Sequence, residues 1–163
     1  IRCFLFSLTN QVSIEASSDD NNSINYVHLK NTSTNLSIIY STSYQNKIYN
    51  QIAKLKKYKN YTIEHPLLIT NPYGTNTTSV YMYFKTSDEL QATYTIHCEG
   101  YNDFSRTLNN NTLSGYTTNH EYLLVGAISG QINTITVTLT NKQGNPVDTL
   151  SWSYNAPSLQ GGD

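Results

Sequence analysis

The sequence predicts a mainly β protein: an immunoglobulin-like or fibronectin-like antiparallel β-sandwich with an N-terminal amphipathic helix. From residue 62 to residue 154, short runs with period-two alternation are separated by turn signals, which is typical of a sandwich. Before residue 62, the apolar residues recur with the period of a helix. We therefore divide the chain into an extension (1–61), a sandwich domain (62–154) and a linker or tail (155–163).

The extension begins with a short apolar run and continues as a polar segment. The run Ile1–Leu8 is too short to cross a membrane, so we expect no membrane insertion by this segment. It is interpreted as the remains of a signal peptide or as a strand. The segment Thr9–Thr34 is rich in Asn, Ser and Asp, and Ser17–Ser23 has no apolar residue. It is predicted to be a loop or a disordered link.

An amphipathic helix is predicted over Ser43–Lys57. Its apolar residues recur at spacings of four, four and three: Tyr44, Ile48, Ile52 and Leu55. Three residues could cap its start: Ser41, Thr42 and Ser43. A helix of this length is marginal alone, so its apolar stripe needs a partner. That partner could be the sandwich, a second copy of the chain, or another domain.

Charge is sparse and nearly balanced over the whole chain. A net charge of -1 argues against a nucleic-acid partner, because phosphate binding needs a basic surplus. One basic stretch, Lys54–Lys59, is interpreted as the solvated end of the helix, where lysine also suits the helix dipole. A patch for a polyanion is the alternative.

Turn residues and alternation predict the first strands. Pro66 interrupts the run Thr62–Ile69 and is expected to place it at an edge or a bend. Asn71–Gly74 is a strong turn signal. In the next strand Val80, Met82 and Phe84 alternate with Tyr81, Tyr83 and Lys85, as on a half-buried strand. Ser87–Glu89 is expected to break this strand before the next one, Ala92–Cys98.

The second half of the sandwich continues in the same way. A short strand is predicted at Phe104–Thr107 and a further strand at Glu121–Val125. Asn133–Thr140 has the cleanest alternation, with apolar residues facing in and threonines facing out. Asn141–Pro146 is predicted to be a hairpin loop with a glycine for the left-handed position. The last strand is Val147–Tyr154.

No residue is predicted to be catalytic, and no metal or cofactor site is expected. The four histidines show no metal-ligand spacing: His28, His65, His97 and His120. His120 is interpreted as a polar residue at a strand end, and its orientation by Glu121 is the alternative. His97 and Cys98 are strand neighbours that point to opposite faces, which disfavours a Cys–His nucleophile. A Cys3–Cys98 disulfide is open, with no spacing rule to support it.

Five tyrosines gather near the predicted first sheet: Tyr73, Tyr81, Tyr83, Tyr94 and Tyr101. The favoured interpretation is that they cover one face of that sheet. Exposed tyrosines can also stack on sugars or form protein interfaces. That alternative would make the chain a stand-alone binding or adhesion module of a cell surface.

Seven segments follow one another in a fixed order along the predicted sandwich: Asn71–Thr77, Val80–Thr86, Tyr94–Ile96, Asp103–Phe104, His120–Tyr122, Gly126 and Asn133–Thr138. This ordered series resembles the N-terminal domain of bacterial aryl-sulfate sulfotransferases. It spans about residues 62 to 154, and the helix more loosely.

The resemblance implies a non-catalytic accessory domain. In the family, a six-bladed β-propeller follows this module and holds the catalytic histidine, so no position here corresponds to that histidine. The expected partners are this propeller, which would lie outside the 163 residues, and a second copy in a homodimer. The expected location is extracellular, on the cell surface or in the periplasm of a bacterium. An enzyme in its own right has no support beyond isolated histidines.

Overall fold

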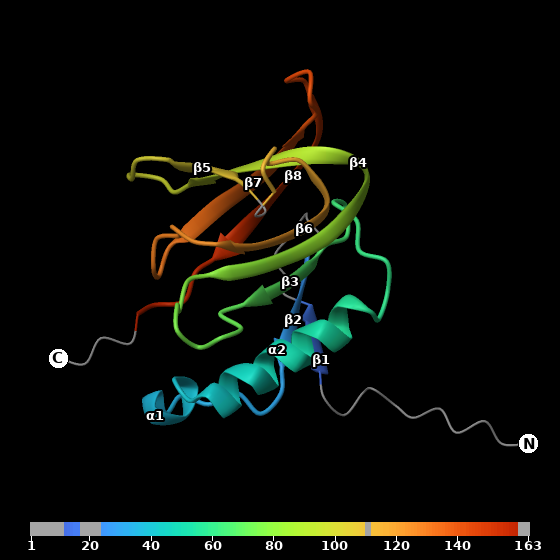
Figure 1. The fold of residues 1–163 in the computed structure, drawn as a ribbon. Helices are drawn as coiled ribbons and strands as arrows, with labels where there is room; N and C mark the ends of the chain where they lie inside the picture. The colour runs from blue at the N-terminus through green and yellow to red at the C-terminus, as the bar shows by residue number, and fades with distance from the viewer. Residues whose placement is uncertain (1–11, 17–23, 110–111, 160–163) are drawn as a thin grey trace, which may run out of the picture.

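The computed structural model describes residues 12–16, 24–109 and 112–159, which form two packed sheets and a layer of two helices (Figure 1). Along the chain the elements are β1 (Val12–Ala16), β2 (Asn25–Leu29), α1 (Leu36–Ile39), α2 (Thr42–Lys56), β3 (Leu67–Thr70), β4 (Val80–His97), β5 (Phe104–Leu108), β6 (Thr117–Leu124), β7 (Ile132–Thr140) and β8 (Pro146–Asn155). The mainly β prediction is confirmed.

Strand β4 belongs to both sheets. Its first half, residues 80–85, pairs antiparallel with β3 and β6, and its second half, residues 91–97, pairs with β5 and β7. The β4–β6 register shifts between Lys85 and Leu90, and an irregularity of this kind lets a strand bend without ending. The predicted break at Ser87–Glu89 is therefore wrong, because the strand continues through these residues.

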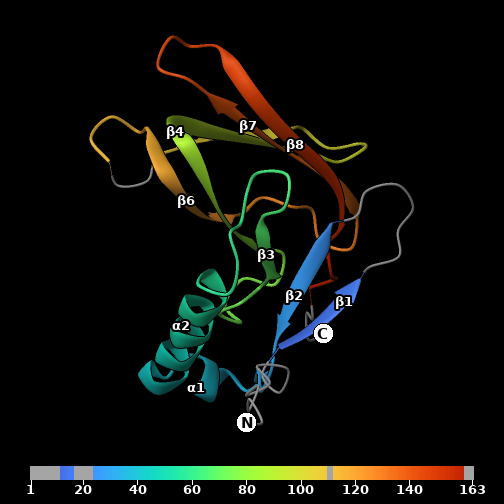
Figure 2. The ribbon, with the colours of Figure 1, turned by 90° about the vertical axis from the view of Figure 1, so that its right-hand side faces the viewer.

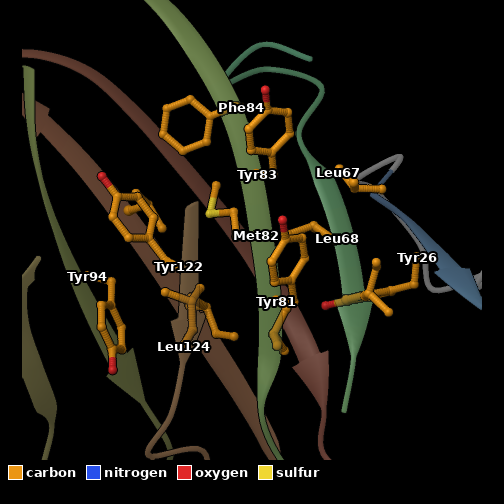
Figure 3. Close-up of a cluster of buried hydrophobic side chains, with 14 of the residues drawn as sticks. Tyr26, Leu67, Leu68, Tyr81, Met82, Tyr83, Phe84, Tyr94, Tyr122 and Leu124 are labelled. Carbon is orange, nitrogen blue, oxygen red and sulfur yellow. The ribbon is translucent and has the colours of Figure 1, made fainter. Parts of the chain in front are cut away.

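The two sheets enclose one buried core. The first sheet has the order β1-β2-β3-β4-β6 and the second β5-β4-β7-β8. Only the β2–β3 pair is parallel among the described pairs. Residues opposite each other on β4 and β6 share a face, so Val80 lies beside Leu124 and Met82 beside Tyr122. Figure 3 shows part of this cluster.

Helix α2 covers the outer face of the first sheet (Figure 2). Its buried residues are Tyr44, Ile48 and Ile52, and the side chain of Ser41 accepts a hydrogen bond from the backbone N–H of Tyr44 at 3.2 Å. The predicted helix is confirmed, with its bounds shifted by one residue. Of the three possible caps the structure uses Ser41, and of the three possible partners the helix packs on the sandwich. Tyr81 and Tyr83 of β4 lie buried under this layer, so the prediction of a half-buried strand is wrong for this part of β4.

Strand β2 closes one side of the sandwich. The hydroxyl of Tyr26 accepts a hydrogen bond from the indole N–H of Trp152 on the opposite sheet at 2.7 Å. The prediction of a loop is therefore wrong for Asn25–Leu29, and it is also wrong for Val12–Ala16, which pairs with it as β1. Ile1–Leu8 and Ser17–Ser23 lie outside the described residues. Residues on both sides of position 61 share the buried core, and the domain division there stays a prediction.

The predicted turns occur where the glycines allow them. The N–H of Gly74 donates to the carbonyl of Asn71 at 3.2 Å, and Gly144 in the β7–β8 hairpin has φ +83°. Pro66 directly precedes β3, which lies between β2 and β4. Of its two predicted places, the sheet edge is wrong, but the bend is confirmed, because residues 63–65 form a bend directly before Pro66. A proline before the first paired residue removes no ladder hydrogen bond, so it is compatible with a central strand.

Candidate functional site

His120 of β6 is the most unusual titratable residue of the sandwich. It is 0% exposed, and its ring stacks on that of Phe84 with centroids 4.5 Å apart and planes 5° apart. The ring fills an inner-face position opposite Phe84 in the β4–β6 ladder. The interpretation of His120 as a polar strand-end residue is therefore wrong, because it belongs to the core.

Hydrogen bonds fix the tautomer of this histidine. The hydroxyl of Thr86 donates its one proton to the carbonyl of Asp88 at 2.7 Å. It must therefore accept from Nε2–H of His120, which lies 3.0 Å away. Nδ1 then carries the lone pair and accepts from the hydroxyl of Tyr122 at 2.6 Å. This chain of bonds connects the core to the bend of β4.

Burial lowers the pKa of His120 from 6.5 to about 4, although a hydrogen bond to the backbone of Thr117 acts in the opposite direction. The imidazole is consequently neutral at pH 7. Both ring nitrogens are bonded and the side chain has no exposed surface. In this arrangement His120 holds the bend of β4 and cannot reach a substrate.

Acid is expected to weaken the fold through His120. Because its pKa is about 4 in the folded state and 6.5 as a free side chain, the unfolded chain binds more protons between these values. The free energy of unfolding should fall by up to roughly 3 kcal/mol as the pH drops from about 6.5 to about 4. Urea denaturation across this range measures the slope. The variant His120→Gln should flatten it, and the exposed control His65→Gln should keep it; equal slopes in all three proteins would refute the assignment.

The neighbouring Glu121 points to the opposite face and joins the sheet to α2. Its carboxylate accepts from the hydroxyl of Tyr81 and lies 2.7 Å from the ammonium of Lys56. The Lys56 ammonium also lies 4.7 Å from the centre of the Tyr83 ring. Glu121 therefore does not orient His120, because adjacent strand residues face opposite ways.

The pKa of Glu121 reflects this cluster. Burial raises the pKa, but the hydrogen bonds from Lys56 and Tyr81 outweigh burial and leave it below the usual value. A carboxyl group whose pKa is lower in the folded protein than in the unfolded chain stabilises the folded state at a pH above its unfolded pKa. This stabilisation is lost as the pH falls through the pKa of the folded state. The carboxylate thus acts as an ionised link between helix and sheet at neutral pH.

Replacing Glu121 with Gln should remove part of this link. Because the side chain is 44% exposed, we expect a loss of only about 1 kcal/mol in the free energy of unfolding at pH 7. The same change at the exposed Glu99 is the control and should be neutral. A double-mutant cycle with Lys56→Gln measures the coupling directly, and a coupling of zero would contradict the proposed link.

The other histidines and cysteines considered in the sequence do not come together in one site. His97 is exposed and lies 2.7 Å from the carboxylate of Asp103, whose hydrogen bond and charge raise the pKa of His97. Cys98 is a buried free thiol, and Cys3 lies outside the described residues. Among the described residues, no group of three His, Cys, Asp or Glu side chains could hold a metal ion. None of the described helices is long and apolar enough to cross a membrane.

The tyrosine cluster is mostly internal. Tyr81, Tyr83 and Tyr94 are buried, Tyr73 is half-buried and Tyr101 is exposed. The hydroxyl of Tyr94 donates to the carbonyl of Val125 at 2.9 Å. The interpretation that tyrosines cover one face of the first sheet is confirmed for Tyr81 and Tyr83. It is wrong for Tyr94, which lies in the half of β4 that pairs with β5 and β7. All three are buried and cannot stack on a sugar in this conformation.

Residues 67–156 match the family model described as the arylsulfotransferase Ig-like domain. The chain belongs to this family. The resemblance seen in the sequence is thereby confirmed. The matched part is the N-terminal Ig-like part of arylsulfotransferases and not their catalytic part. No curated protein matches the chain, and no solved structure matches it either.

The arylsulfotransferase Ig-like domain of this chain is contacted by residues from outside the matched span. His120 and Glu121 lie within residues 67–156, whereas Tyr26 and Lys56 precede them. Sequence reasoning missed the Tyr26–Trp152 pair, whose partners are 126 positions apart. The only local signal was the apolar content of Tyr26, Val27 and Leu29 in an otherwise polar segment.

Proposed function

We propose that the chain is the non-catalytic accessory domain of an aryl-sulfate sulfotransferase-like protein. The longer protein, here called the parent, would carry its catalytic histidine on a β-propeller outside these residues. It would transfer sulfuryl groups from phenolic sulfates to phenols without a nucleotide donor, and act as an exported or surface protein of a bacterium. The observation that carries this proposal is the match of residues 67–156 to the Ig-like part of arylsulfotransferases.

The polar groups of the domain support a structural role. His120 holds the bend of β4, and Glu121 fixes α2 to the first sheet. Each of these groups is engaged inside the fold. The domain would accordingly serve its parent through its surfaces, by docking the propeller and supporting a dimer.

We place the docking contact at the end of the domain where β8 leaves the second sheet. The hydroxyl of Ser129 donates to the carbonyl of Pro157 at 3.0 Å and accepts from the N–H of Leu159 at 2.7 Å. These bonds hold residues 157–159 against the loop between β6 and β7. Beside them, Ile132 and Leu159 are 68% and 64% exposed, and large apolar side chains at such a position suit a contact with a following domain.

This contact has a direct test in the parent. Replacing Ile132 with Asp should lower the melting temperature and the sulfotransferase activity of the parent while leaving the isolated domain unchanged. The control is Val147→Asp, which changes an exposed apolar residue at the opposite end of β8. Equal effects of both variants on the parent would remove the docking proposal.

The alternative, a stand-alone adhesion module, was motivated by the tyrosine-rich sheet and by the low charge. Burial of Tyr81, Tyr83 and Tyr94 removes the first of these two motives. We therefore retain the accessory-domain proposal alone.

A further inference from the structure

The charges of this chain are divided between the helices and the sandwich. Residues 24–63 contain no Asp or Glu and six lysines: Lys30, Lys47, Lys54, Lys56, Lys57 and Lys59. Residues 64–159 contain only three basic residues against seven acidic ones. The near-zero net charge of the whole chain therefore conceals a basic helical layer attached to an acidic sandwich.

Lys47 and Lys54 of α2, together with Lys57 at its C-cap, lie on the outer face of the helix. Ser43, Lys47, Asn50, Lys54 and Lys57 follow one another at spacings of four, three, four and three, which places them on one line along the helix. This line lies opposite the buried residues Tyr44, Ile48 and Ile52 and faces away from the sheets. Its three lysines are exposed.

Helix-end stabilisation explains only part of this pattern. Lysines in the last turn complement the helix dipole, which accounts for Lys54 and Lys56. Lys56 is also paired with Glu121. Neither reason applies to Lys47 in the first half of the helix, nor to the absence of acidic residues from the outer face.

Exposed apolar side chains occupy the same layer. Leu36 and Tyr40 are each 68% exposed, and Ile38 is 47% exposed. Ile39 is buried and lies against Gly74. This contact anchors α1 to the domain, while the side chains of Leu36, Ile38 and Tyr40 remain exposed to solvent. A soluble surface seldom combines lysines with this many aliphatic and tyrosine side chains unless it meets a partner.

We propose that this surface attaches the domain peripherally to a bilayer with anionic phospholipid headgroups. We call it the basic layer, and define it by Leu36, Ile38, Tyr40, Lys47, Lys54 and Lys57. The lysines would face the phosphates, and the apolar side chains of α1 would reach the headgroup boundary, without any segment crossing the bilayer. The basic layer lies outside the matched residues 67–156, so this proposal does not depend on the accessory-domain function.

The exposed apolar residues favour a lipid surface over a dissolved polyanion. A hydrated polymer such as polyphosphate would be bound through charge alone. A bilayer offers a negative surface together with an apolar boundary, which suits a layer with exposed lysines on α2 and exposed apolar side chains on α1. The two partners therefore differ in what they require of α1.

Co-sedimentation with lipid vesicles tests the proposal. The chain should bind vesicles containing phosphatidylglycerol and not vesicles of phosphatidylcholine alone, and added salt should weaken the binding. The triple variant K47Q/K54Q/K57Q should lose roughly 100-fold in partitioning, since each lysine near an anionic surface contributes about fivefold. The matched control K85Q/R106Q/K142Q removes the same charge from the sandwich and should change partitioning by less than about twofold.

A second variant tests the contribution of the apolar side chains of the basic layer. L36S/Y40S keeps the charge and should reduce vesicle binding, and melting temperatures like that of the original chain establish that each variant is folded. Absence of binding to phosphatidylglycerol vesicles at low salt would overturn the proposal. So would equal losses from the two triple variants. Vesicle binding that L36S/Y40S leaves intact, together with equally tight binding of soluble polyphosphate, would reassign the layer to a polyanion.

Discussion

Replacing Ile52 with Asp is expected to lower the free energy of unfolding by roughly 4 kcal/mol or more. Ile52 is 3% exposed in the stripe of α2 that packs on the first sheet. The change removes apolar contacts and places a carboxylate in the buried interface between α2 and the first sheet. Because such a loss approaches the whole stability of a small domain, the variant should be largely unfolded in urea concentrations that leave the original chain folded.

The control for this variant is Asn50→Asp on the outer face of the same helix. It adds the same charge beside Lys47 and Lys54, and should change the free energy of unfolding by less than about 0.5 kcal/mol. Circular dichroism during urea titration follows both variants. Equal stability of Ile52→Asp and the original chain would show that α2 does not belong to the folded core.

Replacing Tyr26 with Ala should cost about 3–5 kcal/mol. The ring of Tyr26 is buried between the sheets, 6.1 Å from that of Tyr154. Its loss also leaves the buried indole N–H of Trp152 without its acceptor. The conservative variant Tyr26→Phe keeps the ring and should cost about 1–3 kcal/mol, the penalty of the unpaired N–H alone.

The exposed Tyr58 provides the matched control for this pair, and Tyr58→Ala should be neutral. Fluorescence of Trp152, the one tryptophan of the chain, follows unfolding and reports on the site itself. Full stability of Tyr26→Ala would mean that β2 only lies against a sandwich that is complete without it. The predicted boundary at residue 61 would then describe an independent folding unit.

The elements that sequence reasoning found are those with a strong local signal. The helix was readable because Tyr44, Ile48 and Ile52 follow the helical period over several turns. The β7–β8 hairpin was readable because strict alternation flanks a loop with glycine at the left-handed position. In both, the residues that decide the structure lie within a few positions of one another.

The features that were missed depend on distant partners. β2 is a strand because it pairs with β1 and β3 and because Tyr26 meets Trp152. The apolar residues of this segment do not reveal these partners. The bend of β4 contains Ser87–Glu89, and the polar sequence of these residues was interpreted as a break between two strands. Thr86, within hydrogen-bond distance of His120 in β6, ties this bend to the sheet. The surroundings of His120 follow from this topology, which explains why its burial could not be foreseen.

The same reasoning applies to the surface. The sequence shows that the lysines are concentrated before residue 64, but their gathering on one face depends on which stripe of α2 is buried. Glu121 looked like a partner of His120 because the two are adjacent in the chain. The pleat of the strand sends Glu121 to the helix side instead, where it meets Lys56.

The most direct test of the central claim is a sulfotransferase assay with a chromogenic phenyl sulfate and a phenol acceptor. The purified chain and its full-length parent are measured side by side, with a folding check on both. We predict activity in the parent and none in the isolated chain. Sulfuryl transfer by the isolated chain would contradict the claim that this domain is non-catalytic, and an inactive but folded parent would contradict the proposed sulfotransferase function.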